Sequence, residues 1–300
     1  MTRINIWLNA VRPRTLPLSL SGIITGSALA WRMNLFDIGI FVPAIFTTLF
    51  LQVLSNLAND YGDALKGTDD EDRVGPRRMV QSGLISHRQI RKGMMILGTL
   101  SFIAGCTLLL NAFGWAQLKY FILFLFIGLL SIWAAIKYTV GNNAYGYRGL
   151  GDLFVMIFFG FVSVSGSYFL YAKSISWSSL VLSLVIGCLA TGVLHLNNMR
   201  DRIQDEKSGK ITMAVKLGGE WSKNYFLLLI ATAIAATLFL LVKTSLHISD
   251  YLIVILFIPW IVMLKKVFSF QQEISYNSLL KPLALSTFAY SILVFITYLL

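Results

Sequence analysis

Two clusters of acidic and amide side chains are the part of this sequence best suited to chemistry. The first runs Asn59-Asp60-Tyr61-Gly62-Asp63, and the second runs from Asn197 to Asp205 with Asp201 between them. Carboxylate and amide oxygens without a paired Cys or His favour a hard cation. Mg²⁺ is the usual choice, because it keeps some of its waters and shares itself with substrate phosphates. The clusters therefore predict binding of Mg²⁺.

The spacing inside each cluster places its polar residues on one face of a helix. If the second apolar helix continues inward, a stripe forms from Gln52, Asn56, Asn59, Asp60 and Asp63. In the second cluster, Asn197, Asp201 and Asp205 recur every four residues at the inner end of the sixth apolar helix. Four crossings separate the clusters, so both lie on the same side of the membrane. Either cluster alone would also fit a solvated loop, whereas two matched stripes indicate one shared cavity.

Basic residues accompany these acids. Carboxylates close to hydrocarbon are costly, and helix C-termini disfavour anions, so cations must compensate. The available side chains are Lys66, Arg73, Arg77, Arg78, Lys137, Arg148, Lys207 and Lys210. A metal ion together with ammonium and guanidinium groups is typical of a diphosphate site. Each of these residues taken singly would also fit an ordinary charge of a cytoplasmic loop.

The elements that position the clusters are membrane helices. Of the 300 residues, 56% are hydrophobic and only 13% are charged, and a soluble fold cannot bury that much apolar surface. The runs lack the alternation of barrel strands, which predicts an all-α polytopic membrane protein. We expect one domain, residues 1–300, with about nine helices around a central cavity that opens near the cytoplasmic face. The expected spans are roughly 15–31, 38–57, 93–111, 118–136, 150–172, 178–197, 225–242, 250–264 and 283–300.

Charge predicts the orientation. With these spans, 21 Lys and Arg residues fall on one side and 4 on the other, and the basic side faces the cytoplasm. That places the N-terminus and the acidic-motif loops 58–92 and 198–224 on the cytoplasmic side of a plasma (inner) membrane. The net charge of +11 follows from this asymmetry, so we expect a lipid bilayer and no nucleic acid as partner. Cys106 and Cys188 lie in apolar runs and are expected to be small buried residues.

The paired acidic motifs on nine spans resemble those of the UbiA superfamily of intramembrane aromatic prenyltransferases. Several further stretches are similar to the branch that prenylates 1,4-dihydroxy-2-naphthoate, and the likeness extends over about residues 7–224. In the superfamily, the first motif generally ends in an acid four residues after Asp63, where this chain has Gly67. Here the next acid is Asp69, and this Gly-x-Asp arrangement resembles the naphthoate branch. The stretches are residues 12–17, 59–69, 75–78, 82–85, 146–152, 197–205 and 209–212.

The resemblance implies transfer of a polyprenyl chain from its diphosphate to the naphthoate ring. Mg²⁺ and basic residues would stabilise the departing diphosphate, and the ring would attack the allylic cation and lose CO₂, giving demethylmenaquinone. The implied catalytic acids are Asp60, Asp63, Asp201 and Asp205. The implied metal ligands are Asn59, Asp63, Asn197, Asp201 and Asp205. The implied diphosphate contacts are Lys66, Arg77, Arg78, Lys137 and Arg148. The implied substrate pocket contains Asn56, Tyr138, Tyr147 and Arg12, with Arg14 as a second candidate for the acceptor's carboxylate.

Three alternatives remain open from the sequence. A related branch would prenylate 4-hydroxybenzoate or homogentisate by the same mechanism. A cation-coupled transporter would also use intramembrane Asp and Asn, although nearer the bilayer midplane. A lipid-binding scaffold would need no carboxylates. His195, two residues before Asn197, is interpreted as a hydrogen-bonded packing residue rather than a base.

Overall fold

The computed structural model describes residues 2–67, 78–244 and 248–299, and all regular elements among them are helical. The N-terminal half contains α1 (Arg3–Val11), η1 (Pro13–Thr15), α2 (Leu16–Arg32), α3 (Ile38–Lys66), α4 (His87–Phe113) and α5 (Leu118–Lys137). The middle contains η2 (Tyr145–Arg148), α6 (Gly151–Val155), the π-helical η3 (Met156–Gly166), α7 (Ser167–Ala172), α8 (Trp177–Arg200) and α9 (Arg202–Lys207). The remainder contains α10 (Met213–Thr244), η4 (Ile248–Leu256), α11 (Phe257–Ser269), η5 (Glu273–Tyr276) and α12 (Asn277–Leu299).

The all-α membrane fold predicted from composition is confirmed. Within the described residues, eight helical segments are long and apolar enough to cross a membrane. They are 38–66, 87–113, 118–137, 151–172, 177–200, 213–244, 250–269 and 273–299. The first expected span corresponds to α2, whose 17 residues make it shorter than the others. The expected count of nine thus becomes eight long helices and one short one.

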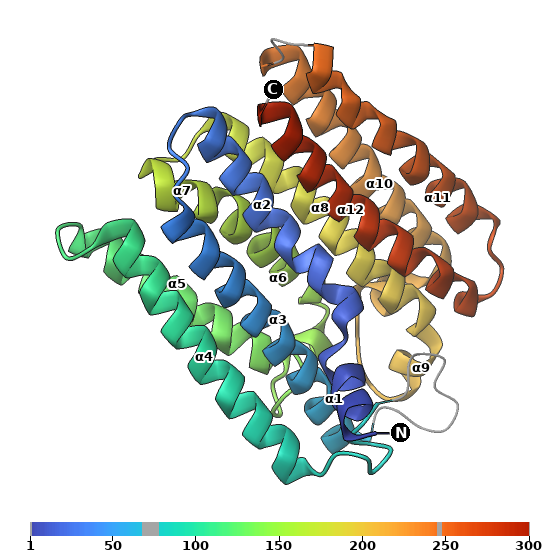
Figure 1. The fold of residues 1–300 in the computed structure, drawn as a ribbon. Coiled ribbons are helices and arrows are strands. Elements are labelled where there is room, and N and C mark those ends of the chain that lie inside the picture. The colour runs from blue at the N-terminus through green and yellow to red at the C-terminus, as the bar shows by residue number, and fades with distance from the viewer. Residues whose placement is uncertain (1, 68–77, 245–247, 300) are drawn as a thin grey trace.

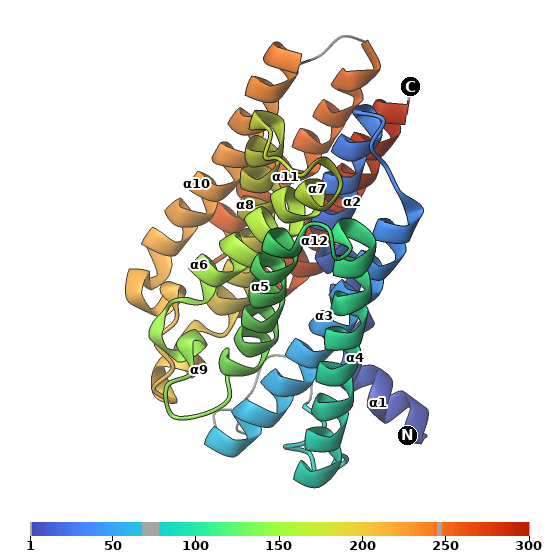
Figure 2. The same ribbon diagram turned by 90° about the vertical axis from the view of Figure 1, so that its left-hand side faces the viewer.

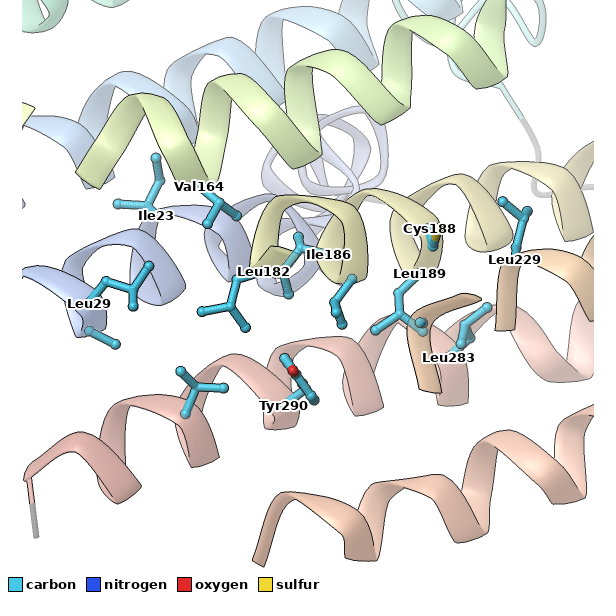
Figure 3. Close-up of a cluster of buried hydrophobic side chains, with 14 of the residues drawn as sticks. Ile23, Leu29, Val164, Leu182, Ile186, Cys188, Leu189, Leu229, Leu283 and Tyr290 are labelled. Atoms are coloured by element: carbon cyan, nitrogen blue, oxygen red, sulfur yellow. The ribbon is translucent and has the colours of Figure 1, made fainter. Parts of the chain in front are cut away.

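The helices form a bundle in which α8 is central. It packs against η3, α10 and α12, while α3, α4 and α5 lie together on another side and α2 contacts both α3 and α12 (Figures 1 and 2). Leu182, Ile186 and Leu189 of α8 are fully buried in the main hydrophobic cluster, together with Leu283 and Tyr290 of α12 (Figure 3). The second acidic cluster therefore begins at the end of the most enclosed helix.

Small residues let α8 approach η3 closely. A Cβ atom added at Gly160 would lie 2.6 Å from the Ser183 carbonyl oxygen, and one added at Gly187 would lie 2.5 Å from the Met156 sulfur. Nearby, the hydroxyls of Ser165 and Ser183 are hydrogen-bonded at 2.7 Å. In lipid the hydrophobic effect does not drive helices together, so van der Waals packing and hydrogen bonds of this kind stabilise the helix pair.

A cavity of about 930 Å³ lies between α2, α3, α4, α5, η3 and α8. Near the helix ends that carry the acidic clusters the lining is polar, and toward the end of α4, the start of α5 and α7 it is mainly apolar. The polar end is lined by Arg12, Arg14, Asn59, Asp63, Arg78, Asn197, Arg200 and Lys210. The apolar end is lined by Leu108, Leu109, Phe124, Leu125 and Leu170. The central cavity expected from the sequence is thus present, with a pronounced change of polarity along it.

Candidate functional site

The first acidic cluster lies on the last turns of α3. As expected, the helix continues past residue 57 and ends at Lys66, where Gly67 adopts the left-handed conformation (φ 60°) that favours glycine. Four members of the predicted stripe line the cavity, namely Gln52, Asn56, Asn59 and Asp63. The Asn56 amide donates to the Val11 carbonyl at 2.8 Å and thereby fixes the start of the chain against α3.

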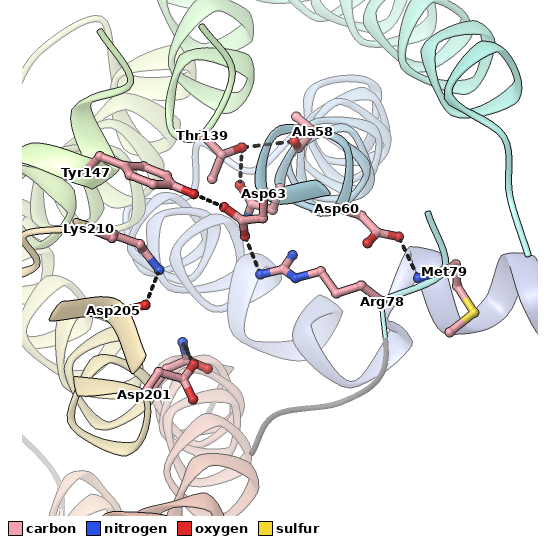
Figure 4. A network of polar contacts seen from close by, with 12 residues as sticks. Ala58, Asp60, Asp63, Arg78, Met79, Thr139, Tyr147, Asp201, Asp205 and Lys210 are labelled. Atoms are coloured by element: carbon pink, nitrogen blue, oxygen red, sulfur yellow. Dashed lines mark hydrogen bonds and ion pairs between the residues drawn. The ribbon is translucent and has the colours of Figure 1, made fainter. Parts of the chain in front are cut away.

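Asp63 is the centre of this cluster. It is 3% exposed. Its Oδ1 accepts a 2.7 Å hydrogen bond from the Tyr147 hydroxyl, and its Oδ2 is ion-paired with Arg78 (Figure 4). Arg78 is also buried and lines the cavity. A buried carboxylate requires such partners, and here they come from two loops distant in sequence.

Asp60 points elsewhere. It is 1% exposed, and its Oδ2 accepts a hydrogen bond from the Met79 backbone N–H at 3.1 Å (Figure 4). One residue further along a helix turns the side chain by about 100°, so Asp60 leaves the face occupied by Asn59. This hydrogen bond fixes the backbone at Met79 against α3.

The second cluster differs from the expected continuous stripe. α8 ends at Arg200, Asp201 is the capping residue between two helices, and Asp205 lies on the short helix α9. The Asp205 N–H still donates to the Asp201 carbonyl at 2.8 Å, so the four-residue spacing survives across the break. The helix was predicted to carry all three polar residues, and this is wrong: the Asp201 N–H still donates to the Asn197 carbonyl at 3.1 Å, but the backbone of Asp201 (φ −93°, ψ 4°) leaves the helical conformation.

Asp201 is held by its neighbour in sequence. The Arg200 guanidinium donates from Nε to Asp201 Oδ1 at 2.7 Å and from Nη2 to Oδ2 at 2.6 Å. Arg200 also donates to the side-chain oxygens of Asn197 and Asn277, each at 2.9 Å. This buried arginine thereby joins α8 to the start of α12.

Asp205 is paired with Lys210. The ammonium lies 3.1 Å from Oδ1, while Oδ2 is buried without a hydrogen-bond partner among the described residues. Burial raises the pKa of Asp205 to about 6, against the opposing effect of the Lys210 charge. Burial also lowers the pKa of Lys210, but the charges of Asp205 and Asp63 outweigh it and raise that pKa above its ordinary value.

The two clusters lie near each other, with Lys210 between Asp63 and Asp205 (Figure 4). Asn59, Asp63 and Asn197 line the cavity, whereas Asp201 and Asp205 are not among its lining residues and lie behind Arg200 and Lys210, which are. The charge of Asp63 contributes to the raised pKa of Asp205, and Lys210 interacts with both carboxylates. No group of three or more Asp, Glu, His or Cys side chains in the described part of the chain is close enough to form a metal cage. The carboxylates instead stand apart, each beside a basic side chain.

The two tyrosines predicted for the substrate pocket lie in different surroundings. Tyr147 lies between charged groups, because the Lys66 ammonium is 3.4 Å and the Lys210 ammonium 5.8 Å from its ring centroid. Tyr138 lines the cavity, and its ring packs against the edge of Tyr145 at 5.4 Å. Tyr138 therefore faces the space that a substrate would fill, whereas Tyr147 contacts the acidic cluster.

Some predicted contacts are not brought to the site. The Arg148 guanidinium donates to Asn143 at 2.5 Å on an exposed loop. The Lys137 ammonium folds back toward Gly141, where an added Cβ would lie 3.1 Å away. Arg77 and Asp69 lie outside the described residues. Arg12, in contrast, lines the polar end of the cavity in a left-handed conformation with φ 53°.

Three residues hold the acidic clusters in place by contacts that the sequence does not predict. Arg200 binds Asp201, and Lys210 binds Asp205. Thr139 was not considered, yet its hydroxyl donates to the Ala58 carbonyl at 2.9 Å, beside Asn59. In the sequence, Arg200 directly precedes Asp201, and Lys210 follows Asp205 by five residues. This proximity was the only sequence signal for the two ion pairs.

His195 is enclosed by protein. Its side chain has no exposure, and Nε2 lies 3.1 Å from the Ser222 carbonyl oxygen. Nδ1 lies 3.4 Å from the Asp152 carboxylate, and the ring packs edge-on against Tyr225. These contacts agree with a hydrogen-bonded packing residue.

Comparison with known proteins gives a consistent result. A model described as the UbiA prenyltransferase family matches residues 19–295. The chain is 44% identical over 225 residues to 1,4-dihydroxy-2-naphthoate octaprenyltransferase of Escherichia coli (strain K12), covering 75% of this chain and 72% of that protein. It is 41% identical over 255 residues to the Haemophilus influenzae protein of the same name, covering 84% and 82%.

Solved structures share the fold. A UbiA homolog from Archaeoglobus fulgidus bound to GPP and Mg²⁺ superposes with a TM-score of 0.70 at 14% identity, covering 98% of this chain and 100% of that one. A UbiA homolog from Aeropyrum pernix K1 gives 0.69 at 14% identity, covering 94% and 98%. With a family model over nearly the whole sequence and relatives at 41–44% identity over most of it, this chain belongs to the UbiA prenyltransferase family.

Proposed function

We propose that this chain is a Mg²⁺-dependent prenyltransferase that transfers a polyprenyl chain to 1,4-dihydroxy-2-naphthoate, with loss of CO₂ and diphosphate. The observation that carries the proposal is the cavity, which is lined at one end by Asn59, Asp63 and Asn197 of the two acidic clusters together with Arg78 and Lys210, and toward the other end mainly by apolar side chains. A prenyl diphosphate has the same polarity along its length. The naphthoate as acceptor is supported by the names of the relatives at 41–44% identity.

The residues at the polar end fit Mg²⁺. The donors are carboxylate and amide oxygens, as Mg²⁺ prefers, and the buried Asp205 Oδ2 has no hydrogen-bond partner among the described residues. Asp63 with Asn59 would hold one position and Asp205 with Asp201 and Asn197 another. Bound Mg²⁺ would supply positive charge against the negative charge that develops on the departing diphosphate. Because the donors form separate groups, substrate oxygens and water would complete the coordination.

The basic residues divide into two groups. Arg78 and Lys210 line the cavity beside Asp63 and Asp205, and we assign them to the diphosphate. Lys66, above Tyr147, can add a charge from the rim. Arg148 and Lys137 have other contacts in this structure, and Arg77 remains a proposal from sequence alone. Asp60 is assigned to anchoring residues 79 and 80 rather than to catalysis.

The remaining cavity accommodates the two organic groups. Leu109, Phe124 and Leu170 offer an apolar environment for the prenyl tail. Tyr138 presents its ring near the polar end, where an aromatic face can stabilise an allylic cation. Arg12 and Arg14 line the same end and are assigned to the acceptor's carboxylate, with Asn56 keeping this segment in place.

The protein is an integral, multi-pass membrane protein. We further propose that residues 1–300 form one domain in a plasma (inner) membrane, with the N-terminus and both acidic clusters on the cytoplasmic side. The proposal is supported by the distribution of Lys and Arg and by α1 and the end of α12 lying at opposite ends of the bundle (Figure 1).

The proposed reaction is tested with the purified full chain, Mg²⁺, a polyprenyl diphosphate and carboxyl-labelled 1,4-dihydroxy-2-naphthoate. We expect a prenylated product that has lost the label as CO₂. Asp63→Asn and Asp205→Asn should each lower kcat/KM at least about 100-fold, since each removes a carboxylate from a metal position. Lys92→Gln, an exposed charge at the start of α4, serves as control.

Two results would contradict the proposal. Turnover of 4-hydroxybenzoate in place of the naphthoate would reassign the acceptor. Unchanged turnover in both aspartate variants would remove the acidic clusters from the reaction.

A further inference from the structure

Three carboxylates of the two clusters, those of Asp63, Asp201 and Asp205, already have a basic partner. Arg78 is ion-paired with Asp63, Arg200 with Asp201, and Lys210 with Asp205. All three basic side chains are at most 10% exposed. Within such enclosure an ion pair is strongly held, because removal of one charge leaves the other buried and uncompensated.

Two of these pairs each occupy one oxygen atom of a carboxylate assigned to the metal, and they leave Asp205 Oδ2 without a hydrogen-bond partner among the described residues. The Lys210 ammonium lies 3.1 Å from Asp205 Oδ1, and the Arg78 guanidinium contacts Asp63 Oδ2. A divalent cation arriving at either carboxylate would meet a positive charge a few ångströms away, and such repulsion is large where water is scarce. The basic group must therefore move, and its charge then needs another anion.

A diphosphate is that anion. Arg78 and Lys210 both line the cavity, so either side chain can exchange a carboxylate oxygen for a phosphate oxygen without leaving the site. Guanidinium and ammonium groups form strong charge-assisted hydrogen bonds with phosphates. The exchange frees the carboxylates for the metal at the moment when phosphate oxygens become available to it.

We propose that Arg78 and Lys210 act as placeholders for the metal ions, so that metal and diphosphate bind cooperatively through exchange of carboxylate partners. This inference rests on the proposed function and deepens it. Coupling of this kind is reciprocal: the metal increases diphosphate affinity by the same factor by which diphosphate increases metal affinity. Arg200, held by Asp201, Asn197 and Asn277, remains a fixed partner.

The first test measures binding of Mn²⁺ alone to the purified full chain, by the loss of the free-ion EPR signal. Lys210→Gln should bind Mn²⁺ about tenfold more tightly than the wild type, because a competitor in direct contact with Asp205 is removed. Arg78→Gln should behave similarly at Asp63, which gives a second variant if one of them fails to fold.

The matched controls separate competition from general electrostatics. Lys216 donates to the Arg148 carbonyl at 2.8 Å, and Lys207 is exposed on α9. Lys207→Gln and Lys216→Gln each remove one charge from the same region without removing one of these carboxylate ion pairs, so we expect less than about a threefold gain. Equal gains in all four variants, or none in the first two, would overturn the proposal.

The second test measures the reciprocal effect with inorganic pyrophosphate in EDTA. Asp205→Asn releases Lys210 and should bind metal-free pyrophosphate about tenfold more tightly than the wild type, although it loses prenyl transfer. Affinity no higher than that of the wild type would overturn the exchange. Failure of the wild type to transfer a prenyl group would count against the proposed function, whereas both binding tests are independent of turnover.

Discussion

At the scale of single residues, Tyr147 links groups that are far apart in the sequence. Its hydroxyl donates to Asp63, and its ring lies beneath the ammonium of Lys66 and within 5.8 Å of that of Lys210. A hydrogen bond to a charged group contributes about 1.5–3 kcal/mol, more than most exposed ion pairs. Tyr147 therefore fixes the orientation of Asp63 as well as the position of the nearby charges.

Separate variants distinguish these two roles. Tyr147→Phe keeps the ring and loses the hydroxyl, so we expect kcat/KM to fall about 10- to 100-fold, with a higher Mg²⁺ concentration needed for half-maximal rate. Tyr147→Leu removes the ring as well and should lower the affinity for the prenyl diphosphate further. The measurement is prenyl transfer as a function of Mg²⁺ and donor concentration.

Tyr61→Phe provides the control. Tyr61 is on the same helix as Asp63, but its ring packs against His87. An equal loss in Tyr61→Phe would show that the effect of Tyr147 is not specific to Asp63.

At the scale of elements, the sequence predicted helix α3 better than the end of α8. The polar residues 52, 56, 59 and 63 are spaced for one face, and the structure places them along the cavity. The second stripe obeys the same spacing, yet the helix breaks at Asp201. Spacing alone does not reveal a break, because the residues keep the same four-residue interval although the backbone at Asp201 leaves the helical conformation.

The sequence also did not predict which basic residues form ion pairs with the acidic clusters. Which of eight basic loop residues meets which carboxylate depends on how the loops fold back over α3 and α9. Lys210 and Arg78 reach the acids, whereas Arg148 and Lys137 turn toward their own loop. Helical periodicity gives the face of a side chain but carries no information about loop paths.

The close packing of η3 against α8 predicts that a larger side chain at Gly160 lowers the stability of the protein. Gly160→Ala places a methyl group 2.6 Å from the Ser183 carbonyl oxygen, so the helices must separate. We expect a loss of about 1–3 kcal/mol in stability and a lower unfolding temperature in detergent. A thiol-reactive dye can report unfolding, because Cys188 of α8 is buried in the folded protein and becomes accessible when the helices separate.

Gly98→Ala is the matched control. An added Cβ at Gly98, inside α4, has no atom within 4 Å, and alanine favours helix formation over glycine. This variant should unfold at the same temperature or slightly higher. A Gly160→Ala protein as stable as the wild type would show that the two helices can move apart without cost.

At the scale of the whole molecule, the bundle separates its charges. The helix ends that carry both acidic clusters also carry most of the basic residues, and the opposite end contains few. The membrane-spanning, all-helical fold was predictable from composition, because it is a consequence of the membrane as a solvent, whereas the direction of the crossings stays a prediction from the distribution of Lys and Arg. The short α2 was the exception in the count, since its 17 residues approach the lower limit for a span.

The orientation can be tested with single cysteines. Lys207→Cys lies on exposed α9, and Gln117→Cys lies on the exposed turn before α5 at the other end. In inside-out vesicles, a membrane-impermeant maleimide should label position 207 and not 117, and right-side-out vesicles should give the reverse. Labelling of both positions from one side would contradict the proposed topology.

The gradient of polarity along the cavity has a consequence for what happens after the reaction. The released diphosphate carries all of the charge, while the prenylated ring has lost its carboxylate and is soluble only in oil. We therefore expect the two products to leave in different directions, the anion from the polar end into water and the quinone precursor from the apolar end among the lipid tails. Each product would then pass directly into the phase in which it dissolves.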